Sequence, residues 1–174
     1  MGGGESQEVA ESSPGRGAGK RRRGREMALQ MLYQLEMGEA TMPRVLRNFD
    51  PFEQLEVERE EEATGETVRP GLLRAAFQYA EELVEGTEEH REEIDELIRG
   101  QAENWRLERM SAVDRNILRL AVYELVFEVE VPKLVVLDEA IELAKRFGSD
   151  RSSGFVNGIL DGLLKSHDLP GTLK

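Results

Sequence analysis

The last third of the chain, residues 110–164, constrains the fold most, because apolar residues recur there every three or four positions. Two joints interrupt this pattern, one at Pro132 and one in the Phe-Gly-Ser sequence at 147–149. Proline disfavours helix at the residue before it, glycine commonly follows a helix end, and serine commonly caps the next helix. The spacing therefore predicts three consecutive amphipathic helices, with Ser149 as the N-cap of the last one.

Helical periodicity also appears in four shorter segments earlier in the chain. They cover residues 20–38, 41–49, 71–86 and 87–100, with a glycine at or just after the end of three of them. Alternating β-branched residues, the usual mark of a strand, are scarce. We therefore expect an all-α fold of about seven helices. Trp105 should be buried between helices, and Arg115 and Arg119 should lie on the exposed side of the helix after residue 110.

The chain of 174 residues is long enough for one domain with a proper core. Residues 1–19 are rich in Gly, Ser and Glu without apolar periodicity, and we expect a disordered extension there. Residues 50–69 are mostly acidic, which predicts a loop. The folded domain is expected at 20–166, followed by a short tail at 167–174.

Charge is distributed unevenly along the chain. The formal net charge is −12, but residues 1–25 hold six basic and three acidic residues, and residues 26–174 hold 17 basic and 32 acidic ones. Most of the basic excess lies at the start of the first expected helix, in Lys20, Arg21, Arg22, Arg23 and Arg25. Cations at a helix N-terminus oppose the helix dipole, so local energetics does not favour them there. This cluster predicts phosphate binding, with a solvated basic end as the plain alternative.

The residues needed for most catalytic chemistry are missing. The sequence has no cysteine, two separated histidines, and no glycine-rich phosphate loop with its lysine. We therefore expect no metal site, no cofactor and no enzymatic activity. No apolar run approaches 18 residues, and no apolar segment follows the N-terminal charges. The chain should thus be a cytoplasmic protein without a membrane segment.

Aromatic residues accompany the arginines. Tyr33 lies a little over two turns after Arg25, and Phe147 and Phe155 flank the joint that contains Ser149. Single-stranded RNA is bound by arginines that contact phosphates and by rings that stack on splayed bases, and a helix N-terminus offers backbone N–H groups to an anion. Core packing is the alternative role for each of the three rings.

Two blocks of this sequence resemble the NusB family of transcription antitermination factors. One is RRRGREMALQMLYQ, at 21–34; the other comprises VDRNILRLAVYEL, VP, EAIELAKRFG and FVNGILD, between 113 and 161. The resemblance implies two small helical bundles packed together, at about 20–87 and 88–166. It also implies binding of boxA RNA from ribosomal RNA transcripts, together with NusE, in an antitermination complex on RNA polymerase. Carried over by motif, the RNA-binding residues are Lys20, Arg21, Arg22, Arg23, Arg25, Tyr33, Phe147, Ser149 and Phe155.

One residue departs from the family pattern, and several alternatives stay open. Arg151 stands where an acidic residue is frequent, which alters the charge of the joint. A protein-interaction module without an RNA role is one alternative. Another is the helical domain of an RNA methyltransferase, although we expect no room for a cofactor-binding domain before Lys174 and there is no cysteine nucleophile. The exposed side of the first helix, around Met27, Met31 and Tyr33, is either an RNA face or a homodimer face.

Overall fold

The computed structural model describes residues 15–51, 70–166 and 169. These ranges contain no strand, which confirms the all-α class. The helices are α1 (Gly15–Met37), α2 (Met42–Asn48), α4 (Pro70–Glu89), α5 (Arg91–Gln101), the short 3-10 helix η1 (Leu107–Arg109), α6 (Ala112–Phe127), α7 (Lys133–Phe147) and α8 (Ser152–Ser166). None of the described helices is long and apolar enough to cross a bilayer.

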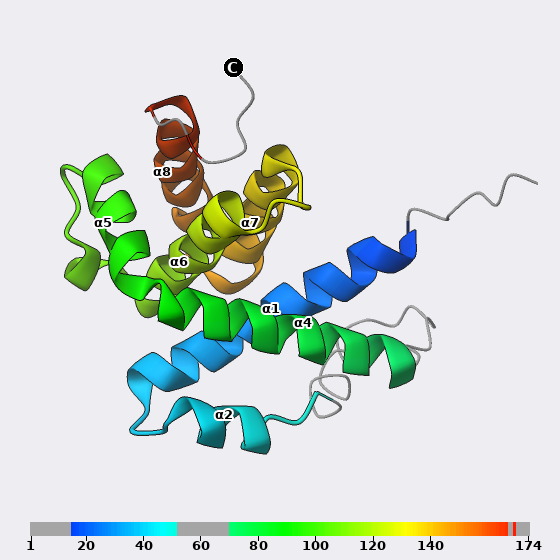
Figure 1. Cartoon of the computed structure of the whole chain (residues 1–174). Helices are drawn as coiled ribbons and strands as arrows, with labels where there is room; N and C mark the ends of the chain where they lie inside the picture. Colours follow the sequence, from blue (N-terminus) through cyan, green and yellow to red (C-terminus); the bar gives the residue numbers. More distant parts are fainter. Residues whose placement is uncertain (1–14, 52–69, 167–168, 170–174) are drawn as a thin grey trace, which may run out of the picture.

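The helices form two groups (Figure 1). In one group α2 and α4 pack on α1, and in the other α5, α7 and α8 pack around α6. Helix α6 also contacts α1 and α4, so it joins the two groups. This central position agrees with the burial of α6, in which nine of the sixteen residues are buried, including the polar Asn116, Arg119 and Glu124.

Several helix ends follow the local sequence. Ser111 is the N-cap of α6, and its hydroxyl accepts a hydrogen bond of 3.1 Å from the backbone N–H of Asp114. Thr41 precedes α2 and Pro43 lies in its first turn, as expected, although the Thr41 side chain makes no capping hydrogen bond. Gly38 follows α1, and its N–H donates to the carbonyl of Gln34.

Other boundaries differ from the sequence prediction. Helix α1 begins at Gly15, so the expected disorder is wrong for residues 15–19; residues 1–14 and 52–69, and most of the expected tail, lie outside the described residues. Helix α4 does not stop at Gly86 but continues to Glu89. A Cβ at Gly86 would lie 2.2 Å from the Tyr123 ring, so this glycine permits close approach of α6 and does not end the helix.

Arg115 and Arg119 are not on an exposed side of α6, contrary to expectation. Arg119 is buried and its guanidinium donates to both carboxylate oxygens of Asp95, at 2.8 and 3.0 Å. Arg115 donates to Glu36 of α1 and to the carbonyls of Leu107 and Met110. These arginines tie α6 to α1, to α5 and to the segment before α6.

Candidate nucleic-acid interface

The arginine-rich start of the domain lies on the first half of α1. Gly24 fixes how this half is turned, because a Cβ there would lie 2.6 Å from the Tyr79 ring and 3.0 Å from the carbonyl of Ala76 on α4. With Gly24 against α4, the side chain of Arg22 is 59% exposed. The neighbouring Arg21, Arg23 and Lys20 are half-buried, and the Lys20 ammonium lies 6.0 Å from the centre of the Tyr79 ring.

The side chain of Arg25, which the sequence predicts to contact RNA, is not accessible in the structure. Arg25 is only 3% exposed, and its Nε lies 3.0 and 2.9 Å from the two carboxylate oxygens of Glu124 on α6. The same carboxylate accepts a 2.7 Å hydrogen bond from the hydroxyl of Tyr79, and burial together with Glu124 raises the pKa of Tyr79. Arg25 is therefore a structural residue that joins α1 to α6, since a guanidinium in a buried pair offers nothing to a phosphate.

Two ion pairs hold the first half of α1 beside the middle and the end of α7. Arg22 donates to the two carboxylate oxygens of Glu139, at 3.2 and 2.9 Å. Arg146 donates to Glu26 at 2.7 Å, and its guanidinium carbon lies 5.3 Å from the centre of the Phe147 ring. The structure thus places Arg22 opposite the middle of α7, and Glu26 opposite Arg146, which lies over the Phe147 ring.

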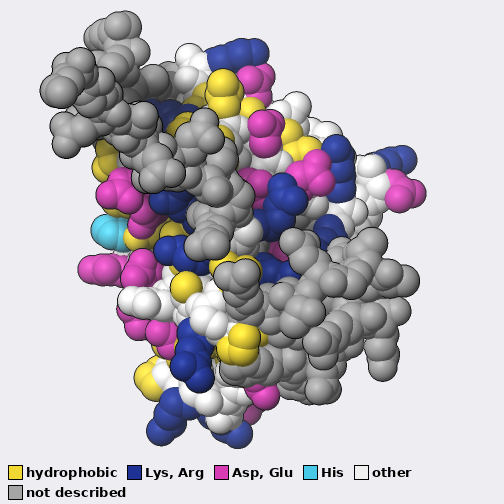
Figure 2. Space-filling view, turned by 90° about the vertical axis from the view of Figure 1, so that its right-hand side faces the viewer, with side chains coloured by type: hydrophobic (Ala, Val, Ile, Leu, Met, Phe, Trp, Pro, Cys, Tyr) yellow, Lys and Arg dark blue, Asp and Glu magenta, His cyan; other side chains and the backbone are white. Residues whose placement is uncertain are grey.

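Carboxylates lie among the arginines on this face. Glu26, Glu139 and Glu142 line a small hollow of about 90 Å³ together with Arg22 and Arg146. The hydrogen bond and the charge of Glu139 raise the pKa of Arg22. On the side of the molecule from which α1 starts, basic and acidic side chains are interspersed (Figure 2). The sequence shows the arginines as a run and could not reveal that Glu139 and Glu142 lie beside Arg22, because these two glutamates belong to α7, more than 100 positions away.

The joint between α7 and α8 is an ordered turn. A Cβ at Gly148 would lie 2.4 Å from the Ser152 side chain, so a residue without a side chain is required. Ser149 is exposed and its N–H donates to the Ser152 hydroxyl at 2.9 Å. Helix α8 begins at Ser152, so Ser149 opens the turn and is not the N-cap as expected. Phe147 and Phe155 are both half-buried and pack against the core with part of each side chain accessible.

Tyr33 is the exposed aromatic of α1. Its side chain is 42% exposed, whereas Met27 and Met31 are 3% and 0% exposed. The expected exposed surface around these three residues is therefore wrong for both methionines, which belong to the core. Tyr33 lies in the second half of α1, beyond the part that the ion pairs hold against α7.

Trp105 is not buried, contrary to expectation. Its side chain is 63% exposed and meets Phe155 edge-on, with 5.7 Å between ring centres. A signal was available in the sequence, because Trp105 stands among polar residues at 101–109 outside any apolar stripe. Among the described ranges, no cluster of three or more His, Cys, Asp or Glu residues could hold a metal ion.

Comparisons with known proteins all lead to one family. The model of the NusB family matches residues 22–165. The transcription antitermination protein NusB of Myxococcus xanthus is 46% identical over 143 residues, which covers 82% of this chain and 93% of that protein. NusB of Sorangium cellulosum is also 46% identical, over 148 residues, 85% of this chain and 94% of the relative.

Solved structures give the same result. T. maritima NusB is 41% identical with a TM-score of 0.62, and the match covers 86% of this chain and 93% of that one. A complex of the antitermination factors NusB and NusE with double-stranded RNA contains a chain that is 26% identical with a TM-score of 0.63, over 85% of this chain and 98% of that one.

Proposed function

The chain belongs to the NusB family, and from this premise we propose that it is a non-catalytic adaptor that binds boxA-type single-stranded RNA of ribosomal RNA transcripts together with NusE. In this role it joins the antitermination complex on RNA polymerase. Its relatives are antitermination proteins, and one solved relative is assembled with NusE and RNA. The chain is accordingly a transcription antitermination factor and not an enzyme.

One structural observation supports the proposed RNA-binding face. The ion pairs Arg22–Glu139 and Arg146–Glu26 join the first half of α1 to α7, the helix that ends at Phe147 and leads into the turn before α8. A basic surface next to partly exposed rings suits single-stranded RNA, because cations contact the phosphates and rings stack on unpaired bases. The proposed contacts are Lys20, Arg21, Arg22, Arg23, Tyr33, Phe147, Ser149 and Phe155, with Arg25 as a structural support.

The test is binding of a fluorescently labelled boxA RNA, followed by anisotropy over a range of salt concentrations. Each phosphate contact with a single strand contributes about −0.7 to the slope of log K against log salt, so four contacts predict a slope of about −2.8. Arg22→Glu combined with Arg23→Glu should weaken binding and make the slope shallower by about 1.4. A slope near zero for the unmodified chain would contradict the phosphate role.

The matched control is Arg44→Glu combined with Arg47→Glu. Both arginines are exposed on α2, which carries none of the proposed contacts, and the pair of changes alters net charge by the same amount. The control should lose less affinity than the α1 variant, and both should keep their melting temperatures. Equal losses would show that only overall charge matters.

A pull-down with NusE, with and without boxA RNA, tests the partner. The proposal predicts that RNA strengthens capture of NusE. Capture of NusE by a chain that binds no RNA would instead identify a protein-interaction module.

A further inference from the structure

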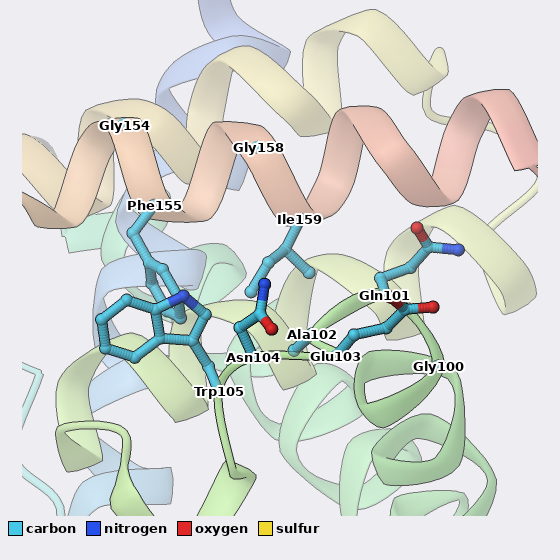
Figure 3. Close-up of a pocket in the computed structure, with 10 residues that line it drawn as sticks. All are labelled: Gly100, Gln101, Ala102, Glu103, Asn104, Trp105, Gly154, Phe155, Gly158 and Ile159. Atoms are coloured by element: carbon cyan, nitrogen blue, oxygen red, sulfur yellow. The ribbon is translucent and has the colours of Figure 1, made fainter.

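A hollow of about 450 Å³ opens between the end of α5 and the outer side of α8 (Figure 3). Trp105 forms one wall of it, and Phe155 stands against Trp105 with the two ring planes at 73°. Concave sites of this size are common for small organic groups. The residues of the ion pairs between α1 and α7 do not line this hollow.

The tryptophan is held in position although it is exposed. The segment that carries it forms a turn, in which the backbone N–H of Trp105 donates to the carbonyl of Ala102 at 3.0 Å. Phe155 supports one edge of the indole, and 63% of the side chain stays accessible. An aromatic surface that is supported on one side and accessible on the other is available to stack on a flat group of a partner.

Helix α8 gives the hollow a flat wall. Gly154 and Gly158 line it, and a Cβ at either position would meet no atom within 4 Å. Glycine inside a helix is less stable than alanine, so local energetics does not explain these two residues. Their absent side chains leave room for a flat group beside the helix.

The polar groups of the hollow suit a base better than a phosphate. Asn104 projects into it beside Trp105, and its carboxamide offers both a donor and an acceptor (Figure 3). None of the lining residues is Lys or Arg, and Glu103 turns its carboxylate away from Trp105. An aromatic wall with a carboxamide beside it matches the stacking face and hydrogen-bonding edge of a nucleobase.

We propose that this hollow binds an unstacked base of the RNA, with Trp105 stacking on the base and Asn104 contacting its edge. The inference rests on the proposed function. Phe155 links the two sites, because it belongs both to the predicted RNA face at the α7–α8 turn and to the hollow. A strand that contacts Phe155 therefore lies next to Trp105.

The chain reports on this site directly, because Trp105 is its only tryptophan. Titration with unlabelled boxA RNA should quench the tryptophan emission, in step with binding measured by anisotropy of labelled RNA. An RNA of the same length with abasic nucleotides should bind more weakly and quench less. Binding without any change in emission overturns the base pocket and leaves the proposed function standing, whereas absence of RNA binding defeats the proposed function itself.

Two variants separate this role from a structural one. Trp105→Ala should weaken RNA binding by about 5- to 150-fold, the loss expected when an aromatic side chain that stacks on one base is replaced by alanine. Gly158→Leu, which fills the hollow with a helix-favouring side chain, should also weaken it, while Gly71→Leu on α4, also at an open position, should not. The proposal is overturned if both hollow variants bind RNA normally, or if NusE alone changes the emission and RNA does not.

Discussion

Arg22 and Arg25 lie one helical turn apart and have opposite environments. Arg22 is 59% exposed and paired at the surface, whereas Arg25 is 3% exposed and paired in the core. An exposed ion pair contributes about 0–1 kcal/mol, but removal of one partner from a buried pair leaves an unpaired charge and costs about 3–5 kcal/mol. Two arginines of one basic run therefore contribute differently to the stability of the fold.

Substitution of each arginine by glutamine tests this distinction. Arg25→Gln should lower the free energy of unfolding by about 3–5 kcal/mol, because Glu124 loses its charged partner in the core. Arg22→Gln should change it by less than about 1 kcal/mol and should weaken RNA binding. Urea denaturation followed by circular dichroism measures the first effect, and equal stability of the two variants would refute the structural assignment of Arg25.

The sequence alone could not separate these arginines. Both belong to the same basic run, and positions three apart in a helix point in neighbouring directions, so periodicity places them together. What separates them is Glu124, which lies 99 positions further along the chain. The same limit applies to Arg119, whose partner Asp95 comes from another helix.

For the helices, apolar periodicity was sufficient to predict that they exist, but it did not predict where all of them begin and end. It predicted α2, with Thr41 before it, and the three helices α6, α7 and α8. It failed at Gly86 because a glycine that ends a helix and one that admits a neighbouring ring look alike in sequence. It also began the last helix at Ser149, where the Ser149–Ser152 hydrogen bond closes a turn first.

Alanine substitutions at two glycines of α4 should have opposite effects. Gly86→Ala should destabilise the protein by about 1–3 kcal/mol, because its Cβ would lie 2.2 Å from the Tyr123 ring. Gly71→Ala meets open space and should stabilise the helix by up to about 1 kcal/mol. Thermal and urea denaturation measure both, and destabilisation of similar size at the two sites would contradict the close approach of α4 and α6.

The pairing of α1 with α7 predicts an effect on RNA affinity. A phosphate must compete with Glu139 for Arg22, because both accept hydrogen bonds from the same guanidinium. Glu139→Gln removes the competing charge, so it should tighten RNA binding several-fold and steepen the salt slope by up to about 0.7. Glu142→Gln, on the same helix, is the control and should have a smaller effect, since Glu142 accepts from Lys145 at 3.4 Å. Weaker RNA binding by Glu139→Gln would show that the ion pair positions Arg22 for RNA.

Among the described helices of the whole molecule, polar contacts join the two helical groups in addition to the apolar core. Glu36 of α1 pairs with Arg115 and Arg119 of α6, and Arg25 pairs with Glu124. The sequence predicted the helices, and the resemblance predicted two bundles and the residues of an RNA site. Neither predicted this polar network or the exposure of Trp105, because both depend on which side chains meet in three dimensions.

The proposed RNA-binding face is formed by the first half of α1 and the α7–α8 turn. Chemical shift changes in the ¹⁵N-labelled chain on addition of boxA RNA map this face residue by residue. We expect the largest changes at 20–24, around Tyr33 and at 147–155, with little change in α2. Changes concentrated in α2 and the exposed side of α4, with none at the α7–α8 turn, would contradict it.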